Sequence, residues 1–261
     1  MGNLACVLAY TERRGSEVIC GDRAHIMLHE GGGCAALAGA MMRTLPVRDE
    51  DGTWELAAMA AAIRGQGESE DPMFPRTRAV CLENTHCALG GRAVPLAWCR
   101  EVRRIAHEKG VCVHMDGARL FNAAAQLGCT VADVAACADS VTFSLSKGLG
   151  GPCGSVVCGT ADFIKKVRRA RKMLGGTMHQ VGVLAAAGLE VLKGPDVLAQ
   201  PRRDHANAAR LAGMINALGE SEVGGEKGQD EGDAVPAQRQ RPRLTAEWPG
   251  TNMIYMHCDP Q

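Results

Sequence analysis

The stretch that decides the fold is residues 141–148, VTFSLSKG, an apolar run that closes on serine, lysine and glycine. Its valine, phenylalanine and leucine predict a short buried strand, and the glycines that follow Lys147 predict a tight turn. Upstream, residues 111–116, VCVHMD, form a similar run that ends at Asp116 and is followed by a glycine. We therefore expect two strands that carry an aspartate and a lysine at their C-terminal ends.

Strands and helices alternate along most of the chain. Further strands are expected at residues 17–21, 77–83 and 154–159, and helices at 3–10, 53–63, 97–109, 131–137, 161–172 and 180–192. This alternation predicts an α/β fold with a mainly parallel sheet that is covered by helices on both faces. Ligands bind such sheets at the carboxyl ends of the strands, where Asp116 and Lys147 are expected.

An aspartate and a lysine at two strand ends suit the chemistry of pyridoxal 5'-phosphate. A buried carboxylate keeps the cofactor's ring nitrogen protonated, so that the ring can accept electrons. A lysine whose amine can lose its charge holds the cofactor covalently through its aldehyde. On the residues alone, alternatives stay open: Lys147 as a surface lysine at the start of a loop, and Asp116 as the cap of a following helix.

Five segments closely resemble those of the low-specificity threonine aldolases, which are fold-type I pyridoxal-phosphate enzymes. They are residues 83–86 (ENTH), 90–92 (GGR), 114–122 (HMDGARLFN), 145–154 (LSKGLGGPCG) and 171–176 (RKMLGG). The resemblance implies an aspartate-aminotransferase-like large domain with pyridoxal 5'-phosphate as cofactor. It also implies aldol cleavage of threonine or allo-threonine to glycine and acetaldehyde, within threonine catabolism and glycine biosynthesis.

The resemblance assigns catalytic and cofactor-binding roles. Lys147 would hold the cofactor covalently, and Asp116 would pair with its ring nitrogen. His25 would stack on the ring and accept the proton of the substrate's hydroxyl, although a structural histidine is the alternative. Glu30 would orient His25. No residue is assigned to a metal.

Further roles follow from the same resemblance. Arg119 would contact the cofactor's phenolic oxygen and the substrate carboxylate, which suits a forked cation that stays charged. Ser146 would lie near the cofactor phosphate and Lys172 beside the substrate, with a structural role as the alternative for each. Asn84 and His86 are expected to shape the loop at the site.

The sequence departs from the resembled family in ways that put cofactor and substrate binding in doubt. A Ser-Gly-Thr phosphate-binding turn would precede Met1, and an arginine for the substrate carboxylate would lie further toward the C-terminus. His179 stands where the family commonly has arginine, and Met73 where many members have histidine. The sequence is thus interpreted as the middle of an aldolase, cut at both ends, with a catalytically impaired fragment as one alternative. A beta-eliminating lyase or an aminotransferase on the same fold is another.

Two domains are expected. Residues 1–195 would form the cofactor-binding large domain without its N-terminal part, and residues 196–261 a partial C-terminal domain. Within the latter, residues 220–243 are rich in Gly, Glu, Gln and Pro and predict a flexible insertion. A strand is expected at 252–256.

Composition argues against several kinds of partner. A formal net charge of zero and 3% aromatic residues give no support for nucleic-acid binding. No apolar run reaches the roughly 18 residues of a membrane span, and no leader is evident. The 12 cysteines form no CxxC pair, so a zinc site and a disulfide framework are both disfavoured. We expect a cytoplasmic enzyme that acts on a small amino acid, and the resemblance implies a homo-dimer or homo-tetramer.

Overall fold

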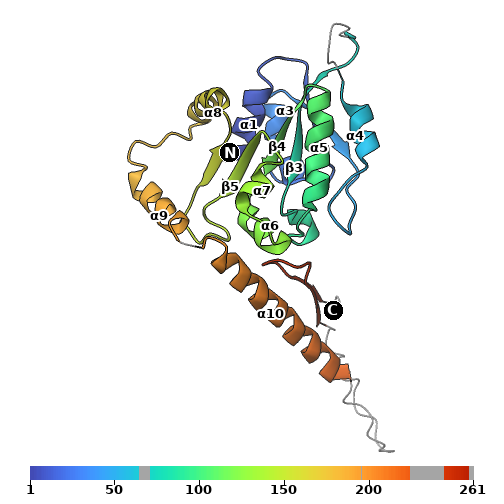
Figure 1. The fold of residues 1–261 in the computed structure, drawn as a ribbon, viewed down its shortest axis with the longest axis vertical. Helices are drawn as coiled ribbons and strands as arrows, with labels where there is room; N and C mark the ends of the chain where they lie inside the picture. The colour runs from blue at the N-terminus through green and yellow to red at the C-terminus, as the bar shows by residue number, and fades with distance from the viewer. Residues whose placement is uncertain (65–70, 195, 224–243, 259–261) are drawn as a thin grey trace, which may run out of the picture.

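A six-stranded sheet forms the framework of the computed structural model, which describes residues 1–64, 71–194, 196–223 and 244–258 (Figure 1). Its strands are β1 (Ser16–Gly21), β2 (Met41–Leu45), β3 (Arg76–Glu83), β4 (Cys112–Asp116), β5 (Ser140–Ser144) and β6 (Ser155–Cys158). They are ordered β2-β1-β3-β4-β5-β6, and only β6 pairs antiparallel to its neighbour. The predicted mainly parallel sheet is confirmed.

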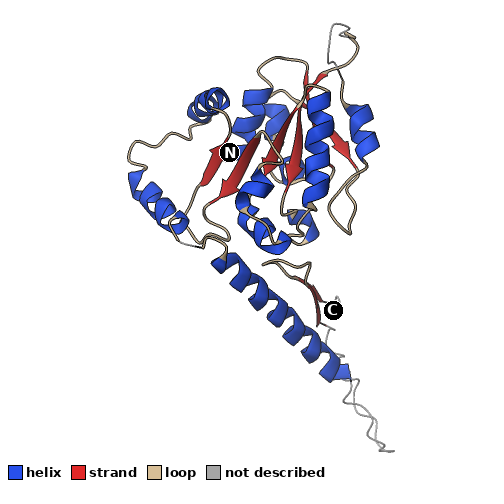
Figure 2. Cartoon of the chain, viewed as in Figure 1, coloured by secondary structure: helices blue, strands red, loops and turns tan. Residues whose placement is uncertain are grey.

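Helices cover both faces of this sheet (Figure 2). The helices are α1 (Gly2–Tyr10), α2 (His25–Leu28), α3 (Gly33–Ala36), α4 (Leu56–Ala62), α5 (Leu96–Glu108), α6 (Leu120–Leu127), α7 (Val131–Ala135), α8 (Ala161–Met173), α9 (Gly182–Leu192) and α10 (Ala199–Val223). Helices α4 to α7 pack on one face of the sheet, whereas α1, α2, α3 and α8 pack on the other. No helix among the described residues is both long enough and apolar enough to cross a bilayer.

The alternation of side chains along β4 determines which residues face α1. Val113 and Met115 are fully buried in the core beneath α5. Successive side chains of a strand point to opposite faces, so His114 and Asp116 lie on the other face, where both contact Asn3 of α1. One face of this strand is therefore apolar core, and the other carries polar groups toward the site.

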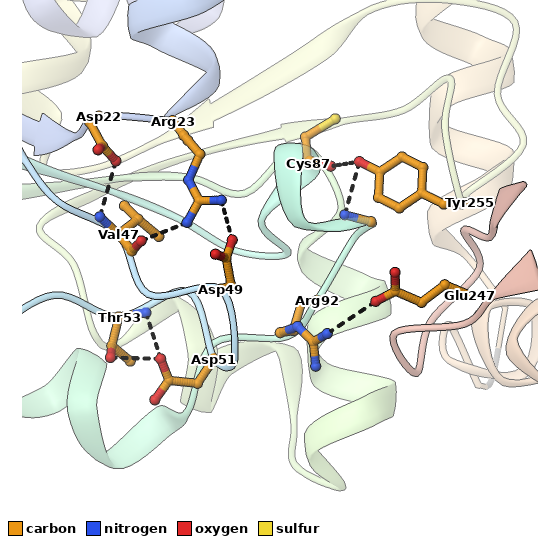
Figure 3. A network of polar contacts seen from close by, with 11 residues as sticks. Asp22, Arg23, Val47, Asp49, Asp51, Thr53, Cys87, Arg92, Glu247 and Tyr255 are labelled. Atoms are coloured by element: carbon orange, nitrogen blue, oxygen red, sulfur yellow. Dashed lines mark hydrogen bonds and ion pairs between the residues drawn. The ribbon is translucent and has the colours of Figure 1, made fainter. Parts of the chain in front are cut away.

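The C-terminal part of the chain packs against a loop of the large sheet. Strands β7 (Leu244–Glu247) and β8 (Tyr255–Cys258) form an antiparallel pair, and the Asn216 side chain of α10 bonds both backbone groups of Ala246. The Tyr255 hydroxyl accepts from the backbone N–H of Gly90 and donates to the carbonyl oxygen of Cys87, each at 3.1 Å. Figure 3 shows Tyr255 beside Cys87, and Arg92 opposite Glu247. This pairing anchors the C-terminal segment to the loop that follows β3.

The structure corrects several predicted boundaries. The strand expected at 252–256 begins at Tyr255, and it pairs with β7, which was not expected. Helix α10 runs into the predicted insertion and reaches Val223, while residues 224–243 lie outside the described residues. The division into two domains at residue 195 stays a prediction.

The strands and α-helices that were not predicted are β2, β7, α2, α3, α6 and α10. Three of them were missed for local reasons. Strand β2 is a short edge strand with little burial, and α6 follows the glycine-rich segment after Asp116 without a capping side chain. Helix α10 is polar along much of its length. Its buried Ala208, Ala212 and Ile215 do follow helical spacing, and this is the signal that would have identified it.

Candidate active site

The C-terminal ends of β3, β4 and β5 lie side by side at one edge of the sheet. In register, Glu83 is opposite Asp116, and Asp116 is opposite Thr142. Lys147 follows three residues after the end of β5. Strands β4 and β5 are parallel neighbours about 4.8 Å apart, so their C-terminal ends lie side by side. Asp116 at the end of β4 and the turn that carries Lys147 after β5 therefore lie at the same edge of the sheet. Asp116 and Lys147 thus follow neighbouring parallel strands, as the sequence predicted.

Asp116 is a buried carboxylate whose two oxygens are both hydrogen-bonded. It is 3% exposed, and its Oδ2 accepts from Asn3 Nδ2 at 2.8 Å. Its Oδ1 accepts from the backbone N–H of Ala118 at 3.1 Å, so it also braces the turn after β4. Burial, and then the charge of Glu30, raise the pKa of Asp116 above its ordinary value. A cationic ring nitrogen placed here would offset that cost.

His25 opens α2 and lies beside the same carboxylates. Its Nδ1 is 3.0 Å from Glu30 Oε1, which confirms the predicted contact between the two residues. Asn3 Nδ2 donates to the same oxygen at 2.7 Å. A carboxylate only accepts, so Nδ1 carries the hydrogen and Nε2 is left as an acceptor. This leaves one ring nitrogen of His25 available to a substrate.

The cluster of His25, Glu30 and Asp116 has the composition of a cation site, because one ligand atom from each lies within 4.8 Å of the others. The Asn3 amide, however, donates to both carboxylates. An N–H group directed at these oxygens occupies the place that a bound cation would need. The donor set fits the edge of a protonated aromatic ring better than a metal ion.

Glu83 is a site residue that the sequence analysis treated only as part of segment 83–86. Its Oε2 accepts from the backbone N–H of His25 and its Oε1 from that of Cys87, both at 2.8 Å. The side chain thus joins the start of α2 to the loop after β3. Burial, followed by the charge of Asp116, raises the pKa of Glu83 to about 7. No local signal marks this role, because the two backbone groups come from separate segments.

Lys147 and Ser146 lie in an exposed turn after β5. The turn is closed by Gly150 N, which donates to Lys147 O at 2.9 Å, and Ser146 N donates to Ser144 Oγ at 3.3 Å. Gly148 is required here because a Cβ would overlap the Oδ1 of buried Asn122. The glycine therefore lets the backbone turn away immediately after Lys147.

The remaining predicted residues lie in different surroundings. Arg119 is half-buried just before α6, and Lys172 is exposed in the last turn of α8. Asn84 is fully buried and bonds both backbone groups of Val94, which is consistent with shaping the loop. His86 is buried in the same loop, and burial lowers its pKa to about 4. The structure brings Asp116 and His25 together with Asn3, Glu30 and Glu83. Within the described part of the chain, the exposed Lys172 forms no hydrogen bond or ion pair with these five residues.

The fold and this edge of the sheet define the class of protein. Aspartate aminotransferase from Thermus thermophilus shares the architecture with a TM-score of 0.64 over 98% of this chain and 59% of its own, at 14% identity. Threonine aldolase from Leishmania major aligns with a TM-score of 0.68 and 25% identity over 85% of this chain and 61% of its own. The chain has the aspartate-aminotransferase-like fold of the fold-type I enzymes.

Sequence comparison places the chain within this class. The model of the beta-eliminating lyase family matches residues 1–236, and the chain belongs to that family. It is 45% identical over 218 residues to low-specificity L-threonine aldolase 1 of Arabidopsis thaliana, with 84% of this chain and 60% of that protein covered. It is 40% identical to the low specificity L-threonine aldolase of Escherichia coli K12, covering 83% and 62%. The chain thus spans about 60% of the length of these relatives.

Pyridoxal 5'-phosphate fits the residues at this edge. Asp116 offers a buried carboxylate, and a pyridinium N–H placed beside it would favour its charged form against the burial that raises its pKa. His25 supplies a ring beside it, and the Gly148 turn leads Lys147 from the adjacent strand.

Proposed function

We propose that this chain catalyses pyridoxal 5'-phosphate-dependent aldol cleavage of threonine or allo-threonine to glycine and acetaldehyde. The observation that carries the proposal is the buried, hydrogen-bonded Asp116 beside His25, at the sheet edge to which Lys147 also belongs. Similarity to named threonine aldolases over more than four fifths of the chain supports the choice of reaction.

Two residues would hold the cofactor, Lys147 through its aldehyde and Asp116 through its ring nitrogen. When bound, the cofactor supplies an electron sink for the carbon from which the aldehyde leaves. Asp116 serves this chemistry by staying ionised, and its hydrogen bonds from Asn3 and Ala118 favour that form. Arg119 and Ser146 are proposed to bind the cofactor's phenolic oxygen and its phosphate.

His25 is the proposed proton acceptor. Glu30 holds its Nδ1–H, so the imidazole presents Nε2 to the β-hydroxyl of the substrate. An ionised Glu30 also stabilises the imidazolium that forms when the proton arrives. Glu83 fixes the backbone of His25 and so limits its movement. Arg119 and Lys172 are proposed to bind the substrate carboxylate.

The experiment that tests the reaction compares two lysines. The full chain is incubated with pyridoxal 5'-phosphate and threonine, and glycine, acetaldehyde, 2-oxobutanoate and ammonia are measured. Lys147→Ala should abolish glycine release, whereas Lys165→Ala, an exposed lysine of α8, should leave it unchanged. Glycine release that survives Lys147→Ala refutes the role of this lysine. Products consisting of 2-oxobutanoate and ammonia, formed by loss of water from threonine, would instead support a beta-eliminating lyase.

We also propose that the chain forms a homo-oligomer. Large apolar side chains are exposed on α9 and α10, including Val183 at 80%, Leu189 at 58% and Met214 at 58%. Exposed apolar groups on neighbouring helices are typical of an interface between protein chains. Light scattering coupled to size-exclusion chromatography measures the mass in solution. A monomeric mass at micromolar concentration would refute the proposal. The cytoplasmic location stays a prediction.

A further inference from the structure

Asn3 connects the site to polar groups buried beneath it. Its Nδ2 donates to Glu30 Oε1 at 2.7 Å and to Asp116 Oδ2 at 2.8 Å. Its Oδ1 lies 3.1 Å from His114 Nε2. Asn3 is itself buried in the first turn of α1, so the amide exchanges no hydrogen bond with bulk water. Both ends of the Asn3 amide are therefore committed to other side chains.

The line of hydrogen bonds continues along the face of the sheet that α1 covers, to Tyr10 at the C-terminal end of that helix. His114 Nδ1 is 2.8 Å from Ser140 Oγ, and these two residues are paired in register on β4 and β5. Ser140 Oγ is in turn 2.8 Å from the hydroxyl of Tyr10. Five side chains thus form a continuous hydrogen-bonded line from Tyr10 to Asp116, and Glu30 joins it at Asn3.

With both carboxylates ionised, one arrangement of hydrogens satisfies every side chain of this line. Two carboxylates accept from Asn3, so both hydrogens of its amide nitrogen are used and its oxygen can only accept. His114 must then donate from Nε2. Because His114 is fully buried, its pKa is lowered to about 4, and the neutral ring accepts at Nδ1. Ser140 therefore donates to His114 and accepts from Tyr10.

We propose that His114 is a positioning residue, which acts through Asn3 to hold Asp116 toward the cofactor ring and Glu30 toward His25. The expected effect on cofactor binding rests on the proposed function. The arrangement of hydrogens along the line does not depend on it. If the Asn3 amide reversed, its oxygen would face two carboxylates and its nitrogen would face the His114 donor. The Nε2–H of His114 and the two carboxylates together oppose this reversal.

The site would respond to loss of that donor. Without it, Asn3 Oδ1 is left buried and unsatisfied, and the amide is held only by its hydrogen bonds to the two carboxylates. Asp116 would then lose a hydrogen bond that favours its charged form and would be a weaker partner for a ring N–H. A purely structural histidine would instead affect folding while leaving the affinity for the cofactor unchanged.

The first measurement uses the chain without cofactor. Nitrogen-15 NMR of histidine-labelled protein should show His114 neutral, with its hydrogen on Nε2, at pH 7. A ring protonated on Nδ1 alone, or on both nitrogens, would overturn the inference. This result does not depend on activity, so it separates the inference from the proposed function. Wild-type chain that binds no cofactor would refute the proposed function, while the NMR result would still decide the arrangement of hydrogens.

The second measurement compares variants by their affinity for pyridoxal 5'-phosphate, determined by equilibrium dialysis. His114→Leu should weaken binding of the cofactor about tenfold or more. Asn3 would lose the donor to its oxygen, and its hydrogen bond to the charged Asp116 would weaken in turn. His114→Gln, whose amide can donate near the position of Nε2, should recover most of the affinity. His257→Leu removes an exposed histidine of β8 outside the line and should bind as wild type does.

Unchanged affinity in His114→Leu would overturn the proposal, as would an equal loss in His257→Leu. Urea unfolding of both variants reports whether they are folded and equally destabilised. If His114→Leu fails to fold, Ser140→Ala serves in its place, because it keeps the His114 ring and removes the donor to Nδ1 together with the acceptor for Tyr10. The hydrogen on Nε2 should then become less favoured in the NMR spectrum. An unaltered spectrum in Ser140→Ala would contradict the proposed line.

Discussion

Replacing Glu83 with glutamine should change how the stability of the protein depends on pH. Glu83 is 9% exposed, and its two oxygens accept from the backbone N–H groups of His25 and Cys87. Burial and the neighbouring Asp116 raise the pKa of Glu83 from 4.5 to about 7. Between these two values the folded protein binds more protons than the unfolded chain. The free energy of unfolding therefore falls as the pH rises.

The size of this effect follows from the two pKa values. At roughly 1.36 kcal/mol for each pH unit between them, Glu83 costs about 3 kcal/mol of stability by the time the pH passes 7. Glutamine stays neutral and avoids this cost, but it has one acceptor oxygen where glutamate has two. The N–H of His25 or Cys87 then loses its partner, at a cost of about 1–2 kcal/mol.

The cost of ionising Glu83 and the hydrogen bond lost in glutamine act in opposite directions. The difference in the free energy of unfolding between variant and wild type should therefore change with pH. At pH 5, where Glu83 is protonated in the folded protein, Glu83→Gln should be less stable than wild type by about 1 kcal/mol. At pH 8 the avoided charge outweighs the lost hydrogen bond, so the variant should be as stable as wild type or more stable by about 1 kcal/mol. Buried His86 and His114 have pKa values lowered to about 4, and their stabilisation is lost as the pH falls below about 6.5. That loss occurs in both proteins and cancels in the difference.

Urea unfolding at 25 °C, at pH 5, 6, 7 and 8, measures the difference in the absence of cofactor. Glu108→Gln is the matched control, because Glu108 is an exposed carboxylate on α5. Its free energy of unfolding should keep a constant small offset from wild type. Parallel pH profiles for wild type and Glu83→Gln would show that Glu83 does not titrate in this range. The reasoning from burial would then be wrong.

Two further substitutions test the turn after β5 and the attachment of the C-terminal segment. Gly148→Ala should destabilise the chain by about 1–3 kcal/mol and weaken cofactor binding, because the new Cβ overlaps Asn122 beside Lys147. Gly182→Ala has open space around its Cβ, and equal effects in the two urea titrations would refute the overlap. Tyr255→Phe should cost about 1 kcal/mol, because its hydroxyl joins Gly90 N to Cys87 O. Unchanged stability would mean that water replaces the hydroxyl in full.

The sequence predicted the parts of the site that depend on neighbouring residues. The apolar run before Lys147 and the glycines after it define a strand and a turn within ten residues. The same holds for the run that ends at Asp116. Such signals are local, because strand periodicity and turn geometry depend on residues close together in the chain. The sheet, its parallel strands and the position of both side chains at strand ends followed from them.

What only the tertiary structure decided is the set of partners around Asp116. Asn3 and Asp116 are 113 positions apart, and Glu83 and His25 are 58 apart, so no local pattern links them. The spacing of His114 and Asp116 placed both on one face of β4, but it could not show that α1 would cover that face with an asparagine. Chain topology brings these groups together, and burial there removes water and alters their pKa values. Residue type and local spacing therefore determined where the site lies, and long-range packing determined how its groups are charged and held.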